Sequence, residues 1–172
     1  MTYFELFEIP VQLQVDKSTL PKKYFELSRK FHPDFYVNSS PEEQADALEK
    51  SALLNKAFRT LQQPDETIRY VLELKGMLEE EEKYELPPSF LMEMMDINEA
   101  LMEADDPMAK ENVETLINQL ETAIAAPVQP ILEAYKDEQT TGEELKKVKE
   151  YYFKKKYIGR IRQQLNNSGK PI

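Results

Sequence analysis

Apolar residues in the first part of the chain recur at helical spacing, and prolines divide the recurrences into separate helices. The first stripe lies at i, i+4, i+7 and i+11 and consists of Leu20, Tyr24, Leu27 and Phe31. This spacing places the four side chains on one face of a helix. Pro33 disfavours helical backbone at the residue before it, so we expect this helix to end at His32. Asp16 or Ser18 is expected to cap its start.

A return helix is predicted to begin at Pro41, with Ser40 as its cap and two glutamates at the positive end of the helix dipole. Its inward stripe is expected to consist of Leu48, Ser51, Leu54, Ala57, Phe58 and Leu61. The two helices should pair antiparallel and leave an exposed corner between them. Pro64 is expected to end the second helix, and a short helix over 66–75, capped by Asp65, should stop before Gly76.

The second half of the chain predicts a small bundle of three helices. Ser89 is expected to cap the first helix, whose apolar residues occupy more than one face: Phe90, Leu91, Met92, Met94, Met95, Ile97, Leu101 and Met102. The next helix starts after Asp106 and has the stripe Val113, Leu116, Ile117, Leu120 and Ile124. Pro127 and Pro130 predict a kink or a break. A capping box at Thr141 and Glu144 starts the last helix, with the stripe Leu145, Val148, Tyr152, Ile158, Ile161 and Leu165.

Composition supports an almost wholly helical chain and excludes several kinds of site. Four glycines among 172 residues are too few for a phosphate-binding loop or a dinucleotide fingerprint. One histidine and no cysteine leave no credible zinc site, no cysteine nucleophile and no direct cysteine ligation of an iron–sulfur cluster. No apolar run approaches the roughly 18 residues that span a membrane, and the N-terminus does not resemble a signal peptide. We expect a cytoplasmic protein without cofactor or metal.

Charge is distributed unevenly along the chain, whose formal net charge is −10. Residues 77–121 carry fourteen acids against two bases, a net of −12, whereas residues 151–172 carry six bases and no acid. Residues 17–30 hold five bases against one acid. The overall balance argues against nucleic acid as the main partner. The acidic and the basic segments are either ordinary solvated helix faces or surfaces that bind two different partners.

The candidate chemistry lies at the corner itself, where His32, Pro33 and Asp34 are adjacent. No Ser/His/Asp triad can be built around a histidine at such a corner, and carboxylate pairs such as Glu79 and Glu82 lie in an exposed charge run. We therefore expect no enzyme. A lone histidine before proline is commonly a surface residue. Here, however, a basic helix precedes the tripeptide and the run from Leu54 to Pro64 follows it, and this combination is specific.

Residues 1 to about 75 resemble a J-domain, the module that docks on a DnaK-type heat-shock ATPase chaperone. The resemblance implies a chaperone-binding surface made of His32, Pro33, Asp34, Lys22, Lys23, Arg29 and Lys30. Phe35 stands where the family usually has a basic residue. No Gly/Phe-rich linker or cysteine-rich region follows, so a general DnaJ-type chaperone is disfavoured.

The whole chain resembles the HscB family of J-domain co-chaperones of iron–sulfur cluster assembly. Four further stretches carry this resemblance, at 3–7, 51–58, 69–76 and 90–93. It implies an L-shaped, all-α protein with a J-domain at 1–76, a linker at 77–88 and a helical bundle at 89–172. It also implies that the protein stimulates a DnaK/HscA-type chaperone and delivers an IscU-type scaffold to it. The alternative is a J-domain adaptor for a different client protein.

The resemblance assigns scaffold binding to one set of positions in the bundle. They are Leu91, Met92, Met95, Asp96, Glu99, Glu103 and Phe153. Methionines at helical spacing are usually core residues, so the competing interpretation is that Leu91, Met92 and Met95 are buried in the bundle. A helix with an extra apolar face flanked by acids can instead offer adaptable contacts to a partner, and this is the interpretation that we prefer.

Overall fold

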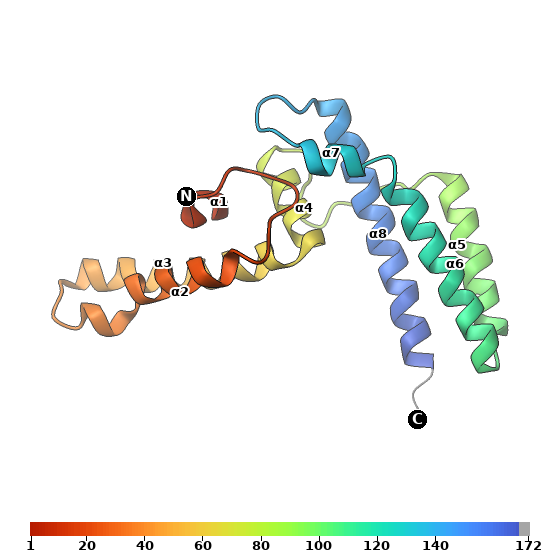
Figure 1. Ribbon diagram of the computed structural model, residues 1–172, viewed down its shortest axis with the longest axis horizontal. Coiled ribbons are helices and arrows are strands. Elements are labelled where there is room, and N and C mark those ends of the chain that lie inside the picture. The colour runs from red at the N-terminus through yellow and green to blue at the C-terminus, as the bar shows by residue number, and fades with distance from the viewer. Residues whose placement is uncertain (169–172) are drawn as a thin grey trace. The chain divides into compact units, whose positions relative to one another are not determined.

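The computed structural model describes residues 1–168, and every regular element among them is a helix (Figure 1). The all-α prediction is therefore confirmed for this part of the chain. The described residues form two compact units. The first comprises Met1–Lys75 together with Tyr135–Gln139, and the second comprises Gly76–Ala134 together with the segment from Thr140 onward.

The first unit is built on an antiparallel hairpin of α2 (Leu20–Phe31) and α3 (Pro41–Gln62), joined by the 3₁₀ helix η1 (Pro33–Tyr36). Buried Leu20, Leu27 and Phe31 form the inner face of α2. Tyr24 stacks on Phe58 of α3 with ring centroids 4.3 Å apart, and its hydroxyl donates to the Asn55 side chain at 2.8 Å. The pairing of the two predicted helices is thus confirmed, and it presents η1 at the far end of the hairpin.

The predicted inner face of α3 is wrong at Leu48. Its side chain is 62% exposed, whereas Ala47 is buried. Ala47 lies two turns before Leu54 and points the same way, and the next residue is displaced by about 100° around the helix. The same displacement explains Leu116 in the second unit, which is exposed while the neighbouring Ile117 is fully buried.

Three predicted helix caps are wrong, and two are confirmed. Neither Asp16 nor Ser18 caps α2, because Asp16 accepts hydrogen bonds from the backbone N–H and the hydroxyl of Ser18 instead. The Ser40 capping box exists: its hydroxyl accepts from Glu43 N–H, and the Glu43 carboxylate accepts from Ser40 N–H. The reciprocal bonds at the start of α8 confirm the second box, between Thr141 and Glu144.

Two helices begin with a proline that precedes the residue expected to cap them, so the expected cap lies inside the helix. Helix α4 (Pro64–Leu74) begins at Pro64, so Asp65 lies in its first turn, and α5 (Pro88–Glu103) likewise begins before Ser89. Proline suits the first position of a helix because its missing N–H would have no partner there. Helix α4 stops before Gly76, as expected, and Gly76 has φ 69°, the left-handed conformation that glycine adopts after the end of a helix.

Other parts of the chain complete the first unit. The short helix α1 (Tyr3–Phe7) packs through Tyr3, whose ring stacks on Tyr70 of α4 at 4.2 Å. Residues 135–139 join the same unit through an ion pair between Asp137 and Lys75. Tyr135 donates to Asp137 at 2.9 Å, and burial together with this bond raises the pKa of Tyr135 to about 12.

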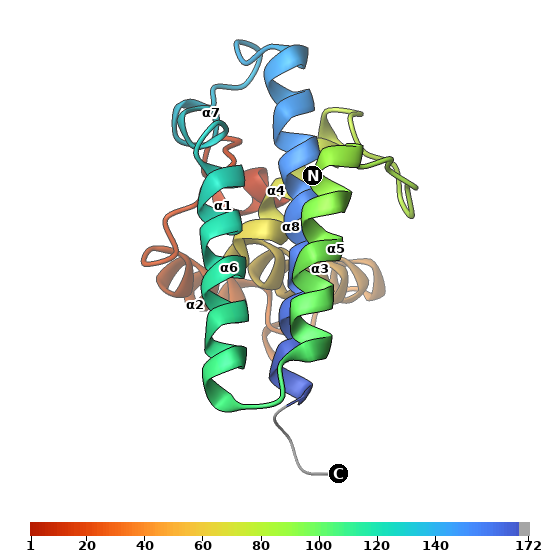
Figure 2. The same cartoon turned by 90° about the vertical axis from the view of Figure 1, so that its right-hand side faces the viewer.

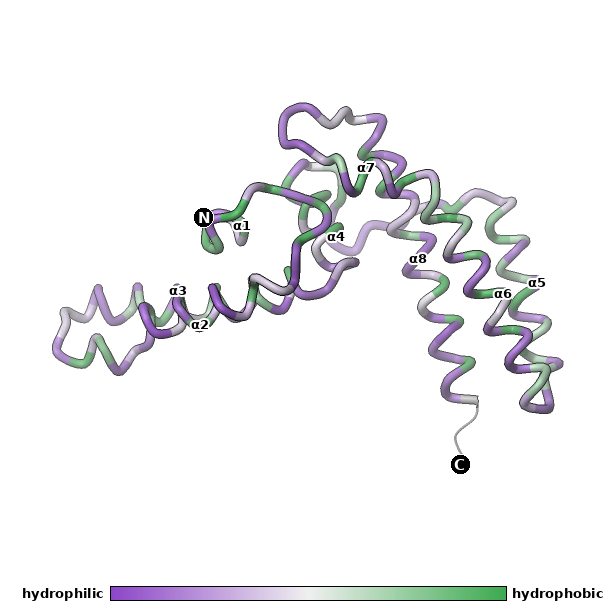
Figure 3. Tube along the Cα trace, viewed as in Figure 1, coloured by the Kyte–Doolittle hydropathy of each residue, from purple (hydrophilic) through white to green (hydrophobic). Residues whose placement is uncertain are grey.

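The second unit is a bundle of α5, α6 (Pro107–Ala125) and α8 (Gly142–Ser168), which lie side by side (Figure 2). Apolar residues recur along α5 and α6 between hydrophilic ones (Figure 3). The buried members form one core: Phe90, Met94, Ile97, Val113, Ile117, Leu120, Ile158, Ile161 and Leu165. The helix expected to be kinked or broken by prolines is broken, because residues 126–128 form a turn before α7 (Gln129–Ala134).

Candidate functional site

The corner between α2 and α3 holds His32 and Asp34 in a defined arrangement. His32 ends α2 with extended backbone, φ −64° and ψ 129°, as expected for a residue before proline. Its ring nitrogen Nδ1 accepts a hydrogen bond from the backbone N–H of Asp34 at 3.2 Å, and the Asp34 carboxylate lies 3.6 Å from the same nitrogen. Both side chains are accessible to a partner, because that of His32 is 54% exposed and that of Asp34 is 85% exposed.

Contacts to both helices fix the loop that carries the tripeptide. The Tyr36 hydroxyl donates to the backbone carbonyl of Lys30 at the end of α2. The Gln44 amide of α3 donates to the carbonyls of Val37 and Ser39. The corner is therefore a braced protrusion that can present His32 to another surface with little loss of loop entropy.

The predicted basic residues of α2 differ in solvent exposure and in ion pairing. Lys22, Arg29 and Lys30 are exposed. Lys23 is half-buried and pairs with Glu8 at 2.6 Å, and this hydrogen bond lowers the pKa of the Glu8 carboxyl. Lys22, Arg29 and Lys30 can therefore offer their charge to a partner more readily than Lys23 can.

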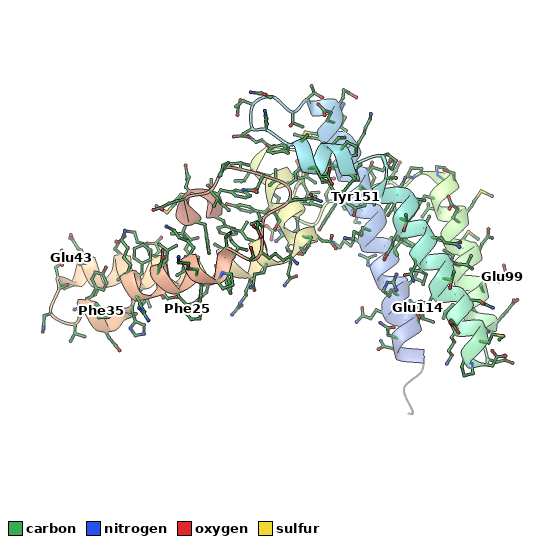
Figure 4. All side chains as sticks on the ribbon, viewed as in Figure 1. Phe25, Phe35, Glu43, Glu99, Glu114 and Tyr151 are labelled. Carbon is green, nitrogen blue, oxygen red and sulfur yellow. The ribbon has the colours of Figure 1, made fainter. Side chains whose placement is uncertain are left out.

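Apolar side chains also reach the surface of the hairpin. Phe25 is 65% and Phe35 is 72% exposed, and both project from it in Figure 4. The Phe35 ring lies edge-on to His32 with centroids 6.3 Å apart. Val37 and Leu48 line a shallow hollow beside Pro33 and Asp34. The apolar periodicity of α3 predicted that Leu48 points inward, so this hollow was not predicted.

In the bundle, the predicted scaffold-binding residues of α5 lie on its surface. Met92 and Met95 are 66% and 68% exposed, whereas Met94 between them is fully buried. Leu91 is exposed at 36%, so these side chains are not core residues. The three acids of the predicted set, Asp96, Glu99 and Glu103, are also exposed, and Glu99 lies on the outer side of α5 (Figure 4).

The seventh predicted residue, Phe153 on α8, lies with Leu91 in one open groove of about 620 Å³. Tyr84 stacks on Phe153 with centroids 4.6 Å apart. The structure thus brings Leu91 and Phe153 together, although 62 positions separate them in the sequence. Tyr84, Lys156 and Arg160 also line the groove, and we did not predict them. The sequence signal for Tyr84 was its position as the one uncharged residue of the run 79–85.

Comparisons with known proteins agree over both halves of the chain. The model of the HSCB C-terminal oligomerisation domain matches residues 86–166. A co-chaperone protein HscB homologue from Shewanella amazonensis is 40% identical over 111 residues, which are 62% of this chain and 64% of that protein. Another from Cupriavidus taiwanensis is 34% identical over 119 residues, which are 69% of this chain and 68% of that protein. The chain belongs to the HscB family.

The structure of human co-chaperone protein HscB supports the same assignment for the fold. It matches this chain with a TM-score of 0.81 at 28% identity, over 100% of this chain and 84% of that one. HscB structures have an N-terminal J-domain and a C-terminal helical bundle, so the α2–α3 hairpin belongs to a J-domain and α5, α6 and α8 to the bundle. The alignment with the Shewanella relative spans slightly less than two thirds of that protein's length.

Within residues 1–168, no three histidine, aspartate or glutamate side chains converge so that they could hold a metal ion. No helix of the described part is both long and apolar enough to cross a membrane.

Proposed function

We propose that this protein is a J-domain co-chaperone that stimulates ATP hydrolysis by a DnaK/HscA-type chaperone and delivers an IscU-type iron–sulfur scaffold to it. The observation that carries the proposal is the braced, exposed His32-Pro33-Asp34 corner at the end of a hairpin whose first helix is basic. Membership of the HscB family, whose members are named co-chaperones, supports it.

The proposed mechanism is allosteric and involves no reaction on this chain. Exposed Lys22, Arg29 and Lys30 steer the encounter with an acidic surface of the chaperone. The corner then binds the hydrolysing arrangement of the ATPase more tightly than the resting one, and that difference in affinity shifts the chaperone between the two states. His32 and Asp34 act here as docking residues rather than as acid or base.

The proposed client surface is the exposed face of α5. Met92 and Met95 provide flexible apolar contacts, and Asp96, Glu99 and Glu103 surround them with negative charge. A scaffold with an apolar patch bordered by basic residues is complementary to such a face. The iron–sulfur cluster stays on the scaffold, so this chain would need no metal ligand of its own.

The test is the substitution His32→Gln, measured by single-turnover ATP hydrolysis with the DnaK/HscA-type chaperone of the same organism. We expect stimulation to be abolished, with helical content and scaffold affinity unchanged, because the His32 side chain is exposed and belongs to neither hydrophobic core. Asn38→Gln is a matched control, since Asn38 is an exposed residue of the same loop. Normal stimulation by the His32→Gln variant would refute the proposal.

A further inference from the structure

A groove on the bundle has a composition that the proposed client surface does not explain. It lies between the segment 82–86, the start of α5 and one face of α8, and its volume is about 620 Å³. This is within the range of about 300–1,000 Å³ in which proteins bind small ligands or the anchor residue of a partner. Its apolar lining includes Leu86, Leu91 and Phe153. Its charged lining consists of Glu82, Lys83, Glu85, Lys156 and Arg160.

One wall of the groove is fixed by contacts that join the segment before α5 to α8. Glu82 pairs with Lys149 at 2.7 Å, and both side chains are largely shielded from solvent. Tyr84 and Phe153 stack with an interplanar angle of 1°, and the Lys149 ammonium lies 5.8 Å from the centre of the Tyr84 ring. The expected linker therefore includes an ordered wall, so the groove exists before any partner binds.

The charges that line the groove are unusual for an acidic protein. Among the bases of α8, Lys149, Lys154 and Arg162 each pair with a carboxylate of the bundle. Lys156 and Arg160 are exposed, and neither forms an ion pair with a described residue. They follow Phe153 by three and seven positions, which places all three on one face of α8. Lys83 and Glu85, both exposed, line the groove as well, and Glu82 is paired with Lys149. The groove thus combines an aromatic wall with three bases against one acid outside an ion pair, in a chain of net charge −10.

We propose that this groove extends the client surface and takes an acidic segment of the partner. An apolar side chain of that segment packs against Phe153 and Leu91, and a neighbouring carboxylate binds Lys156 and Arg160. The inference rests on the proposed function, because the groove shares Leu91 with the exposed face of α5. It adds a specificity requirement: the partner must present a base-rich patch to α5 and an acidic segment to α8.

The experiment is isothermal titration calorimetry of the full chain with the apo IscU-type scaffold of the same organism, at low and moderate salt. We expect Lys156→Glu and Arg160→Glu each to weaken binding about threefold to tenfold at low salt. The difference from wild type should shrink as salt screens the charges. Lys147→Glu is the matched control, because Lys147 is an exposed lysine of α8 that does not line the groove. It should change the affinity less than twofold.

The possible results distinguish a failure of the groove proposal from a failure of the proposed function on which it rests. If wild type binds the scaffold and the two groove variants behave like Lys147→Glu, no acidic segment binds in the groove. The proposal that the exposed face of α5 binds the scaffold is then unaffected. If wild type does not bind the scaffold, the proposed function fails and the inference fails with it. Tighter binding by Lys156→Glu would mean that a basic segment occupies the groove, which also contradicts the proposal.

Discussion

The hairpin corner and the bundle surface differ in how the chain builds them. His32, Pro33 and Asp34 are consecutive in the sequence. Their geometry is set by the extended backbone that Pro33 favours at His32, by the hydrogen bond from Asp34 N–H to His32 and by a short loop. The groove instead brings together Tyr84, Leu91 and Phe153 from three separate segments. A site made of consecutive residues can be recognised as a motif, whereas a site assembled by packing becomes visible only with the fold.

The two regions also differ in what stabilises them. Large apolar side chains from three helices fill the bundle core, and Met94 is fully buried there. The far end of the hairpin depends on caps and polar contacts, such as the box at Ser40, and its apolar residues Phe35 and Leu48 face solvent. Three substitutions, in order of expected effect, test this contrast.

The largest effect should come from Met94→Ala. Removing a buried side chain leaves a cavity and should reduce the stability of the bundle by about 2–5 kcal/mol. The neighbour Met95 is exposed, so Met95→Ala should change stability by less than about 0.5 kcal/mol. Hydrogen exchange of bundle amides reports this unit separately from the other. Equal losses in the two variants would contradict the assignment of core and surface on α5.

An intermediate effect is expected from Ser40→Ala at the start of α3. The substitution removes the acceptor for Glu43 N–H and should cost about 0.5–2 kcal/mol, seen as faster exchange of amides in the first turns of α3. Ser40→Asp keeps an acceptor and should stay within about 0.5 kcal/mol of wild type. If the alanine variant exchanges like wild type, the cap does not hold the end of the hairpin.

The smallest effect concerns the ion pair of Lys75 and Asp137. The hydrogen bond from Lys75 lowers the pKa of Asp137 in the folded chain. This contribution is therefore present above the unfolded pKa of about 3.9 and is lost as the pH falls through the lower folded value. Because the pair is partly exposed, we expect it to be worth less than about 1 kcal/mol. Asp137→Asn should flatten the acid dependence of first-unit stability between about pH 5 and 3. An unchanged profile would mean that the pair contributes nothing.

Much of the fold follows from local rules, and its errors have local causes. The end of α2 at His32, the box at Ser40 and the left-handed Gly76 were all predictable from one or two neighbouring residues. Leu48 and Leu116 were misplaced because an apolar residue one position from a buried one still fits a loose helical stripe. Pro64 was expected only to end α3, but it also begins α4. Ser89 was expected to cap α5, which begins one residue earlier, at Pro88.

The candidate sites divide in the same way. The position of His32 at the end of α2 was predictable from Pro33, whereas the hollow beside the corner at Val37 and Leu48 was not. The surface position of Met92 and Met95 was favoured by resemblance and is now supported by their exposure. Tyr84, Lys156 and Arg160 could not be predicted, because no local pattern shows that residues 82–86 lie against α8.

Our central proposal is that the His32 corner acts on the ATPase of the chaperone while the bundle selects the client. One experiment tests this directly: single-turnover ATP hydrolysis by the chaperone, with and without scaffold, for His32→Gln and for the double variant Leu91→Ala with Met95→Ala. We predict that His32→Gln loses all stimulation yet binds scaffold normally. The double variant should keep the stimulation seen without scaffold and lose the additional stimulation that scaffold brings. If either variant impaired both activities together, the separation of tasks between the two regions would be wrong.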